Sequence, residues 1–304
     1  NCETTCPSGV RYSALLEIGR EQAEQRIGRP WQQRALRWLI RHILPYPERF
    51  TPLLRLGQFF RPILPGALRK KVPPYHRPTI TVMPAKAGIQ ESPLKPLDSG
   101  LRRNDEMGEE IVHATAKQAR RMLVLEGCAQ PALAPNINAA ATRVLDRLGI
   151  TLISAQGAGC CGAVCHHTSG VEEGLAQARR NIDAWWPQVE AGAEAIVMTA
   201  SGCGVQVKDY GHLLRADVVY ADKARRIAAL TQDISEILSK EDLSRLKLNV
   251  QPGIKVVFQT PCSLQHGQQI NGVVEKILRD LGFEPMPVAE AHLCCGSAGT
   301  YSLL

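Results

Sequence analysis

The sequence lacks any long hydrophobic run. None of its apolar stretches approaches the roughly 18 residues that a membrane-spanning helix needs, and the longest, such as AIVMTA at 195–200, have the length of strands. The sequence also shows no secretory signal peptide. Its 304 residues are 44% hydrophobic and 21% charged, a composition that excludes disordered and fibrous proteins and leaves room for two globular domains.

Two further absences narrow the function. The sequence has no glycine-rich dinucleotide fingerprint and no recognisable nucleic-acid-binding module, so we expect no nucleic-acid partner and no dinucleotide bound by this chain. The net charge of +7 is local, because residues 1–71 hold thirteen Lys and Arg against five Asp and Glu, while the rest sums to −1. The basic side chains are interleaved with apolar ones, as in QQRALRWLIRHIL. This pattern fits solvated helix faces, or docking to an acidic partner subunit or an anionic membrane surface.

The cysteines carry most of the information. They lack the dense, short-loop spacing of a small secreted disulfide domain, and clustered cysteines without an export signal favour metal binding or redox chemistry. The ten are Cys2, Cys6, Cys128, Cys160, Cys161, Cys165, Cys203, Cys262, Cys294 and Cys295.

Their spacing indicates an internal duplication. Cys128 lies 32 residues before the pair Cys160-Cys161, and Cys262 lies 32 residues before the pair Cys294-Cys295. Glycine follows each pair, and VLDRLGI in the first interval resembles ILRDLGF in the second. The sequence therefore predicts two copies of one unit.

Each copy has the pattern of a strand, a helix and a second strand. In the first copy RMLVLEGC predicts a strand that ends at Cys128, and TLISA predicts the next strand; IKVVFQTPC and EPMPV repeat this around Cys262. AEAIVMTASGC predicts a further strand with Cys203 at its end. We expect an α/β fold with mostly parallel sheets, preceded by a helical N-terminal segment. Open sheets of this class bind ligands beyond the carboxyl ends of their strands, where the repeated cysteines fall.

A repeated Cys-Cys-Gly suits a soft metal centre. Thiolates from distant sequence positions can converge at strand ends on one cluster. Glycine after the pair permits an unusual φ and a close approach of chain to cluster, and nearby amide donors stabilise the charge on sulfur. The simpler alternative is two buried structural cysteines beside a turn glycine.

The N-terminus favours iron over zinc. Cys2 and Cys6, followed by Pro7, form the closing half of the bacterial ferredoxin run C-x2-C-x2-C-x3-C-P. Because the chain opens on Asn1 inside this motif, we expect a fragment whose opening half lies upstream, and Cys6 would serve a cluster encoded mostly there.

The Cys-Cys-Gly units resemble the CCG cysteine-rich domains of heterodisulfide reductases and of iron–sulfur subunits of flavin dehydrogenases. More narrowly, NCETTCPSGV, MLVLEGCAQPALAPNINAAATRVLDRLGI, NIDAWWP, TASGCG and HLCCGSAGTYSL resemble the glycolate oxidase iron–sulfur subunit, over about 1–71 and 120–304. The resemblance implies an electron-carrying subunit of an oxidoreductase with ferredoxin-type [4Fe-4S] clusters and no catalytic residues of its own. Electrons would pass from a flavin subunit that oxidises glycolate to glyoxylate toward a quinone-type acceptor. The implied location is cytoplasmic, peripheral to the inner face of the plasma membrane.

The resemblance also implies which cysteines bind clusters. The first copy offers four thiolates, with Ala200 where the wider pattern has another cysteine, whereas the second offers three, and its fourth ligand would lie beyond Leu304. Cys165 has no counterpart in the second copy, so we expect it to be a neighbouring thiol outside the ligand set. The predicted ligands are Cys128, Cys160, Cys161 and Cys203 for the first copy, Cys262, Cys294 and Cys295 for the second, and Cys2 and Cys6.

The domain organisation follows from these patterns. Between residues 72 and 119 the sequence has little apolar periodicity and many Pro, Gly and charged residues, so we expect a disordered insertion. The predicted order is the end of a ferredoxin-type motif at 1–10, a basic helical segment at 11–71, the insertion at 72–119, a first CCG domain at 120–250 and a second, truncated one at 251–304.

Three other functions stay open. The chain could belong to a CCG-type thiol/disulfide reductase of the heterodisulfide reductase kind, or to a lactate or glycerol-3-phosphate dehydrogenase. A structural zinc module fits least, because zinc sites use C-x2-C pairs more often than adjacent cysteines.

Overall fold

The structure is a computed structural model, and it describes residues 10, 12–66, 69, 72–74, 120–291, 293 and 299. Most of the predicted insertion, from 75 to 119, lies outside the described residues. The ferredoxin-like motif and four of the predicted cluster ligands also lie outside them; these ligands are Cys2, Cys6, Cys294 and Cys295.

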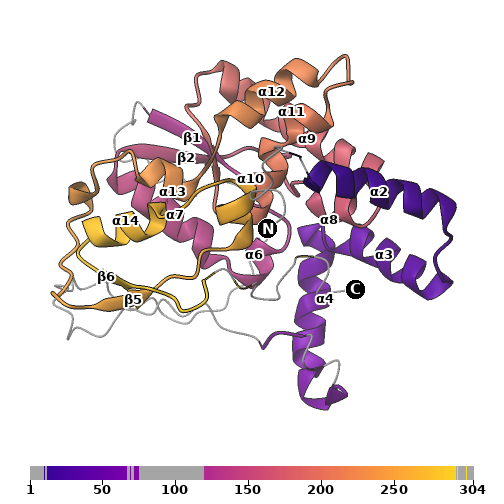
Figure 1. The fold of residues 1–304 in the computed structure, drawn as a ribbon, viewed down its shortest axis with the longest axis horizontal. Helices are drawn as coiled ribbons and strands as arrows, with labels where there is room; N and C mark the ends of the chain where they lie inside the picture. The colour runs from indigo at the N-terminus through magenta and orange to yellow at the C-terminus, as the bar shows by residue number, and fades with distance from the viewer. Residues whose placement is uncertain are drawn as a thin grey trace, which may run out of the picture.

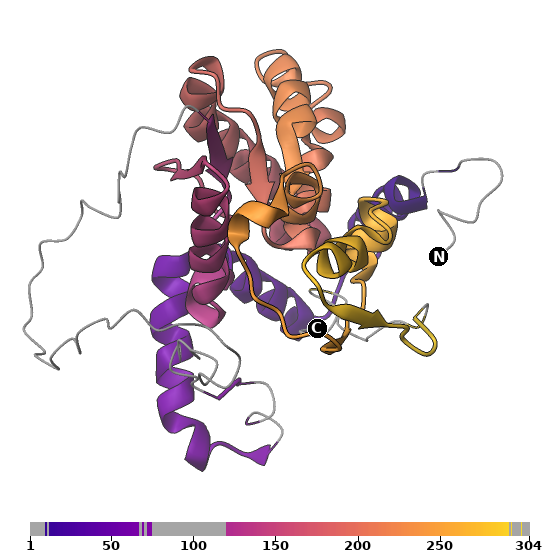
Figure 2. The ribbon, with the colours of Figure 1, turned by 90° about the vertical axis from the view of Figure 1, so that its left-hand side faces the viewer.

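The N-terminal segment is helical, as the basic amphipathic pattern predicted, and three of its helices are described in full. They are α2 (Tyr12–Arg26), α3 (Trp31–Ile43) and α4 (Pro47–Phe60), followed by the 3₁₀ turn η1 (Arg61–Ile63). Pro47 opens α4 at the position where a proline costs no helical hydrogen bond. Figures 1 and 2 show these helices, in indigo and violet, beside the α/β body, with α4 projecting from it.

A four-stranded, wholly parallel sheet forms the centre of the first unit, which confirms the predicted fold class. The strand order is β2-β1-β3-β4, with β1 at Arg120–Val124, β2 at Ile150–Ser154, β3 at Ile196–Met198 and β4 at Thr231–Asp233. The helices of this unit are α6 (Gln130–Leu133), α7 (Asn136–Arg147), α8 (Ala163–His167), α9 (Val171–Glu190), α10 (Ser201–Lys208), α11 (Tyr210–Leu213), α12 (Ala221–Leu230), α13 (Ile234–Leu238) and the 3₁₀ turn η3 (Leu243–Leu246).

Both faces of this sheet are covered. Leu123 and Ile196, which are paired in the register, face a core built with Trp185 of α9 and with α10 and α12. Their neighbours Met122 and Val197 face the opposite core, built with α7 and α13. Successive strand residues point to opposite faces, so a sheet buried on both sides needs continuous apolar strands, which the sequence supplies.

The second unit repeats the strand–helix–strand order of the first. Strand β5 (Lys255–Val257) and strand β6 (Glu284–Met286) pair in parallel, and between them lie the π-helical turn η4 (Ser263–Gly267) and α14 (Val273–Asp280). Figure 2 shows this unit, in yellow, to one side of the first. The predicted duplication is therefore visible in the order of the elements.

Several element boundaries differ from the prediction. Strand β1 ends at Val124, because Gly127 adopts a left-handed φ of +81° and turns the chain before Cys128. Strand β3 ends at Met198, and Cys203 lies in the first turn of α10 rather than at a strand end. Strand β4 was not predicted.

Candidate metal centre

Four cysteines meet beyond the carboxyl end of the sheet. Side-chain hydrogen-bonding contacts link Cys128 to Cys160, Cys160 to Cys161, and Cys161 to Cys203. Cys128 lies in the loop after β1, the pair lies in the loop before α8, and Cys203 lies in α10. We call this group the first nest. The structure thus brings together all four ligands predicted for the first copy.

The first nest is nearly closed to solvent. Cys160 and Cys161 are buried, and Cys128 and Cys203 are half-buried. The contact with Cys160, together with burial, raises the pKa of Cys128. Contact with Cys160 lowers the pKa of Cys161, but contact with Cys203 and burial outweigh it and raise that pKa well above its ordinary value.

This donor set suits a cationic, sulfur-seeking group. Four thiols in mutual contact cannot all become thiolates in an apolar site unless a positive charge joins them. Iron–sulfur clusters take Cys thiolates, one for each iron of a four-iron cluster. Within the described parts of the chain, no three His, Cys, Asp or Glu side chains are arranged around a single metal ion.

Gly162 fixes the turn that follows the cysteine pair. Its φ is +94°, and a Cβ added there would lie 2.7 Å from the backbone oxygen of Gly174 in α9. The predicted unusual φ is therefore present. The close approach, however, is between this turn and α9, which the sequence pattern did not indicate.

Two buried polar side chains at the nest were missed in the sequence. Asn181 of α9 and Tyr210 of α11 have no exposed surface, and both hydrogen-bond to the backbone of the Cys160-Cys161 pair. The sequence offered one indication of Asn181: it is a polar residue on the apolar side of α9, next to Ile182.

Cys165 lies outside the chain of cysteine contacts. It is buried in α8, and the side-chain amide of Gln177 donates a hydrogen bond to its Sγ at 3.5 Å. Burial raises the pKa of this thiol to about 11. At neutral pH little of this thiol is therefore in the reactive thiolate form.

The second copy is described only in part. Cys262, at the start of η4, is exposed. The side-chain amide of Gln259 donates to the backbone oxygen of Ala291 at 3.0 Å. This bond holds the segment before Cys262 beside the segment that leads to the second cysteine pair.

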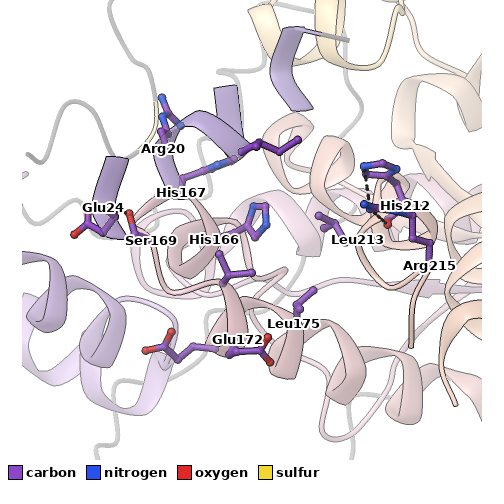
Figure 3. Close-up of a pocket in the computed structure, with 13 residues that line it drawn as sticks. Arg20, Glu24, His166, His167, Ser169, Glu172, Leu175, His212, Leu213 and Arg215 are labelled. Carbon is purple, nitrogen blue, oxygen red and sulfur yellow. Dashed lines mark hydrogen bonds between the residues drawn. The ribbon is translucent and has the colours of Figure 1, made fainter. Parts of the chain in front are cut away.

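A pocket of about 540 Å³ lies on the outer side of α8 (Figure 3). It is lined from α2, α8, α9 and α11, and α8 begins two residues after Cys161. Figure 3 shows basic and acidic side chains around it, with Arg215 hydrogen-bonded to His212. Its charged lining residues are Arg20, Glu24, Glu172, Glu173 and Arg215, joined by His166, His167 and His212.

The N-terminal helices attach to the body near this pocket. Arg41 of α3 donates to the backbone oxygen of Thr168 at 3.1 Å and pairs with Glu173 at 3.6 Å. Large apolar side chains on these helices stay exposed, among them Trp31, Phe59 and Ile63. Among the described helices, none is both long and apolar enough to cross a membrane.

Comparisons with known proteins agree with the repeated unit. The model of the cysteine-rich CCG domain matches residues 122–208 and 256–303, once in each copy. The chain is 49% identical over 303 residues to the glycolate oxidase iron-sulfur subunit of Escherichia coli (strain K12), covering 100% of the chain and 66% of that protein. It is 26% identical over 312 residues to the probable glycolate oxidase iron-sulfur subunit of Bacillus subtilis (strain 168), again covering 66% of that protein.

A more distant relative matches a shorter region. Lactate utilization protein A of Bacillus licheniformis is 28% identical over 173 residues, which cover 55% of the chain and 68% of that protein. The chain spans just under two thirds of the length of its two full-coverage relatives. The chain therefore carries two CCG cysteine-rich units and is similar along its whole length to the glycolate oxidase iron-sulfur subunits.

Proposed function

We propose that this chain is the electron-carrying iron–sulfur subunit of a glycolate dehydrogenase complex. The observation that carries the proposal is the first nest, in which four cysteines from three segments meet in a partly buried site beyond the carboxyl end of the sheet. The proposed substrate comes from the names of the two relatives that match the whole chain, a glycolate oxidase iron-sulfur subunit and a probable one.

In this proposal the first nest ligates one cluster, of the [4Fe-4S] type. When bound, such a cluster takes up and gives back one electron at a time. The protein supplies the four thiolates, and the surrounding structure buries two of them, those of Cys160 and Cys161. The backbone N–H groups of Gly162 and Ala163 donate toward Cys160 and Cys161, which stabilises negative charge on their sulfurs.

A second cluster site would comprise Cys262, Cys294 and Cys295. The bond from Gln259 to Ala291 supports this, since it draws the two cysteine-bearing segments together. Cys2 and Cys6 would belong to a ferredoxin-type site. The predicted domain boundaries at 10, 71, 119 and 250 belong to the same proposal.

The partners follow from the division of labour. A flavin-containing subunit would oxidise glycolate to glyoxylate and reduce the clusters, and a quinone-type acceptor would receive the electrons. The basic N-terminal helices suit an anionic membrane surface at the inner face of the plasma membrane, because α3 carries Arg34 and Arg37 and the exposed Trp31, and α4 carries the exposed Phe59.

Lactate is a second candidate substrate to test directly, because lactate utilization protein A of Bacillus licheniformis matches 55% of the chain at 28% identity. The experiment combines the anaerobically purified chain with its flavin subunit and follows cluster absorbance as glycolate or lactate is added. We expect glycolate to bleach the absorbance and lactate to act more slowly. A colourless protein that contains zinc instead of iron and acid-labile sulfide would contradict the proposed function, and faster bleaching by lactate would reassign the substrate.

A further inference from the structure

The buried side chains of Asn181 and Tyr210 hydrogen-bond to each other and to the backbone around the cysteine pair. The side-chain amide of Asn181 donates to the backbone oxygen of Cys160 at 2.9 Å and to the Tyr210 hydroxyl at 3.1 Å. The Asn181 Oδ1 accepts from the backbone N–H of Gly159 at 2.8 Å. The Tyr210 hydroxyl donates to the backbone oxygen of Cys161 at 2.8 Å.

Every polar atom of this network has a partner. Asn181 uses both of its amide hydrogens and its oxygen, and Tyr210 both donates and accepts. Both side chains have 0% exposed surface. Burying an asparagine and a tyrosine hydroxyl costs free energy unless they are fully hydrogen-bonded. The network therefore favours the one backbone conformation of the cysteine turn that satisfies all of these bonds.

The network fixes the direction of the amide groups that face the sulfurs. The peptide between Cys161 and Gly162 is planar, with its oxygen held by Tyr210 on one side and its N–H donating toward the Cys160 sulfur on the other. The next N–H, that of Ala163, donates toward the Cys161 sulfur. Because the peptide group is rigid, the hydrogen bond that fixes the Cys161 carbonyl also fixes the direction of the Gly162 N–H toward the Cys160 sulfur.

We propose that Asn181 and Tyr210 are positioning residues that set the reduction potential of the cluster in the first nest. This inference rests on the proposed function. N–H groups directed at cluster sulfurs stabilise the more negative, reduced form and so raise the reduction potential. The side chains act through the backbone of the cysteine pair and do not touch the cluster.

Tyr210→Phe tests this with the loss of one atom. The aromatic ring keeps its packing, while the Cys161 carbonyl loses its donor and the Asn181 amide loses an acceptor. We expect the chain to keep its iron, with the midpoint potential of the first-nest cluster shifted to a lower value in an EPR-monitored redox titration. Asn181→Leu should shift it further in the same direction or cost the first nest its iron.

Two variants control for ordinary destabilisation. Tyr220→Phe also removes a tyrosine hydroxyl. This hydroxyl donates to the Asp183 carboxylate at 2.7 Å and makes no bond to the cysteine pair. Ile182→Val trims a fully buried core residue next to Asn181. Neither should move the potential. An unchanged potential in Tyr210→Phe, or equal shifts in the two controls, would overturn the proposal.

A measurement on the metal-free chain separates this inference from the proposed function. We expect Tyr210→Phe to speed amide hydrogen exchange in the peptide that contains Gly162 and Ala163, and Tyr220→Phe to leave it unchanged. If the chain binds no iron at all, the proposed function fails, but faster exchange still shows that the hydrogen bonds of Asn181 and Tyr210 hold the backbone of the cysteine pair. Unchanged exchange in Tyr210→Phe would show that they do not hold it.

Discussion

Gly162 meets two separate structural demands. Its φ of +94° strains any residue with a side chain, and a Cβ would also press against the backbone oxygen of Gly174. The glycine after the cysteine pair is predictable from sequence as a turn residue. Its second demand depends on how closely α9 approaches, which no local pattern records.

Gly162→Ala should therefore destabilise the first unit more than strain alone does. We expect the free energy of unfolding to fall by about 2 kcal/mol or more, because left-handed strain costs of the order of 1–3 kcal/mol and the contact with α9 adds to it. Gly192→Ala is the matched control, since its φ is +89° and no atom lies within 4 Å of the added Cβ. Urea denaturation of both variants measures the difference, and equal losses would contradict it.

The cysteines of the first nest should differ sharply from their neighbour. Cys161→Ser removes a thiol that touches two others, so we expect the chain to lose most of the iron of the first nest after anaerobic reconstitution and gel filtration. Cys165→Ser changes a thiol whose partner is Gln177, and iron content should be retained. Equal iron loss in the two variants would show that the ligand set is assigned wrongly.

Among the elements, α10 joins the two units. It carries Cys203 of the first nest, and η4 of the second unit packs against it. The Ser201 and Ser263 hydroxyls are 2.6 Å apart, and the Gln268 side chain donates to the backbone oxygen of Ser201 at 3.0 Å. The segment that follows Cys262 is thereby fixed on the helix that holds Cys203.

Gly267→Ala should loosen this joint. An added Cβ would lie 2.5 Å from Cγ2 of Val205, and because a β-branched side chain has few rotamers, we expect η4 to move away from α10. We expect faster hydrogen exchange in α14 and unchanged exchange in β1. Gly202→Ala is the control, because the space around Gly202 is open and alanine favours a helix. If exchange in α14 stays as slow as in the parent chain, the joint does not depend on this close approach.

Element boundaries show where sequence patterns lose precision. The prediction ended the third strand at Cys203, yet β3 stops at Met198 and a helix follows. Small residues such as Ala200, Ser201 and Gly202 fit a strand end or a helix start equally well. The contact of α10 with β4 and η4 selects the helix, and those partners lie far along the chain.

The whole molecule combines two unequal copies. The first has a four-stranded sheet covered on both faces, whereas the described residues of the second form two short strands, with Val257 68% exposed and Met286 40% exposed. A two-stranded sheet is marginal by itself and needs a packing partner. The described part of the second unit therefore depends on its contacts with α10 and α13.

Limited proteolysis should separate the N-terminal helices from the two units. The sequence between 72 and 119 lacks the apolar pattern needed to bury a core, so we expect the first cuts there. The product would be a C-terminal piece with all eight downstream cysteines, identified by mass spectrometry. Cleavage first within 120–250 would argue instead for a folded insertion.

The sequence by itself determined the class of fold, the duplication and the cysteines that meet in the first nest. The fold class and the duplication follow from hydrophobic period and from residue spacing, which are local or repeat at a fixed interval, and the resemblance to CCG domains implied the set of four cysteines. Only the tertiary structure decided which side chains hydrogen-bond to the backbone of the cysteine pair. Along the sequence, Tyr210 lies 49 residues from Cys161, and Asn181 lies 21 residues from Cys160. A buried polar side chain is chosen by the partner that folding brings to it, and that partner leaves no periodic trace in the sequence.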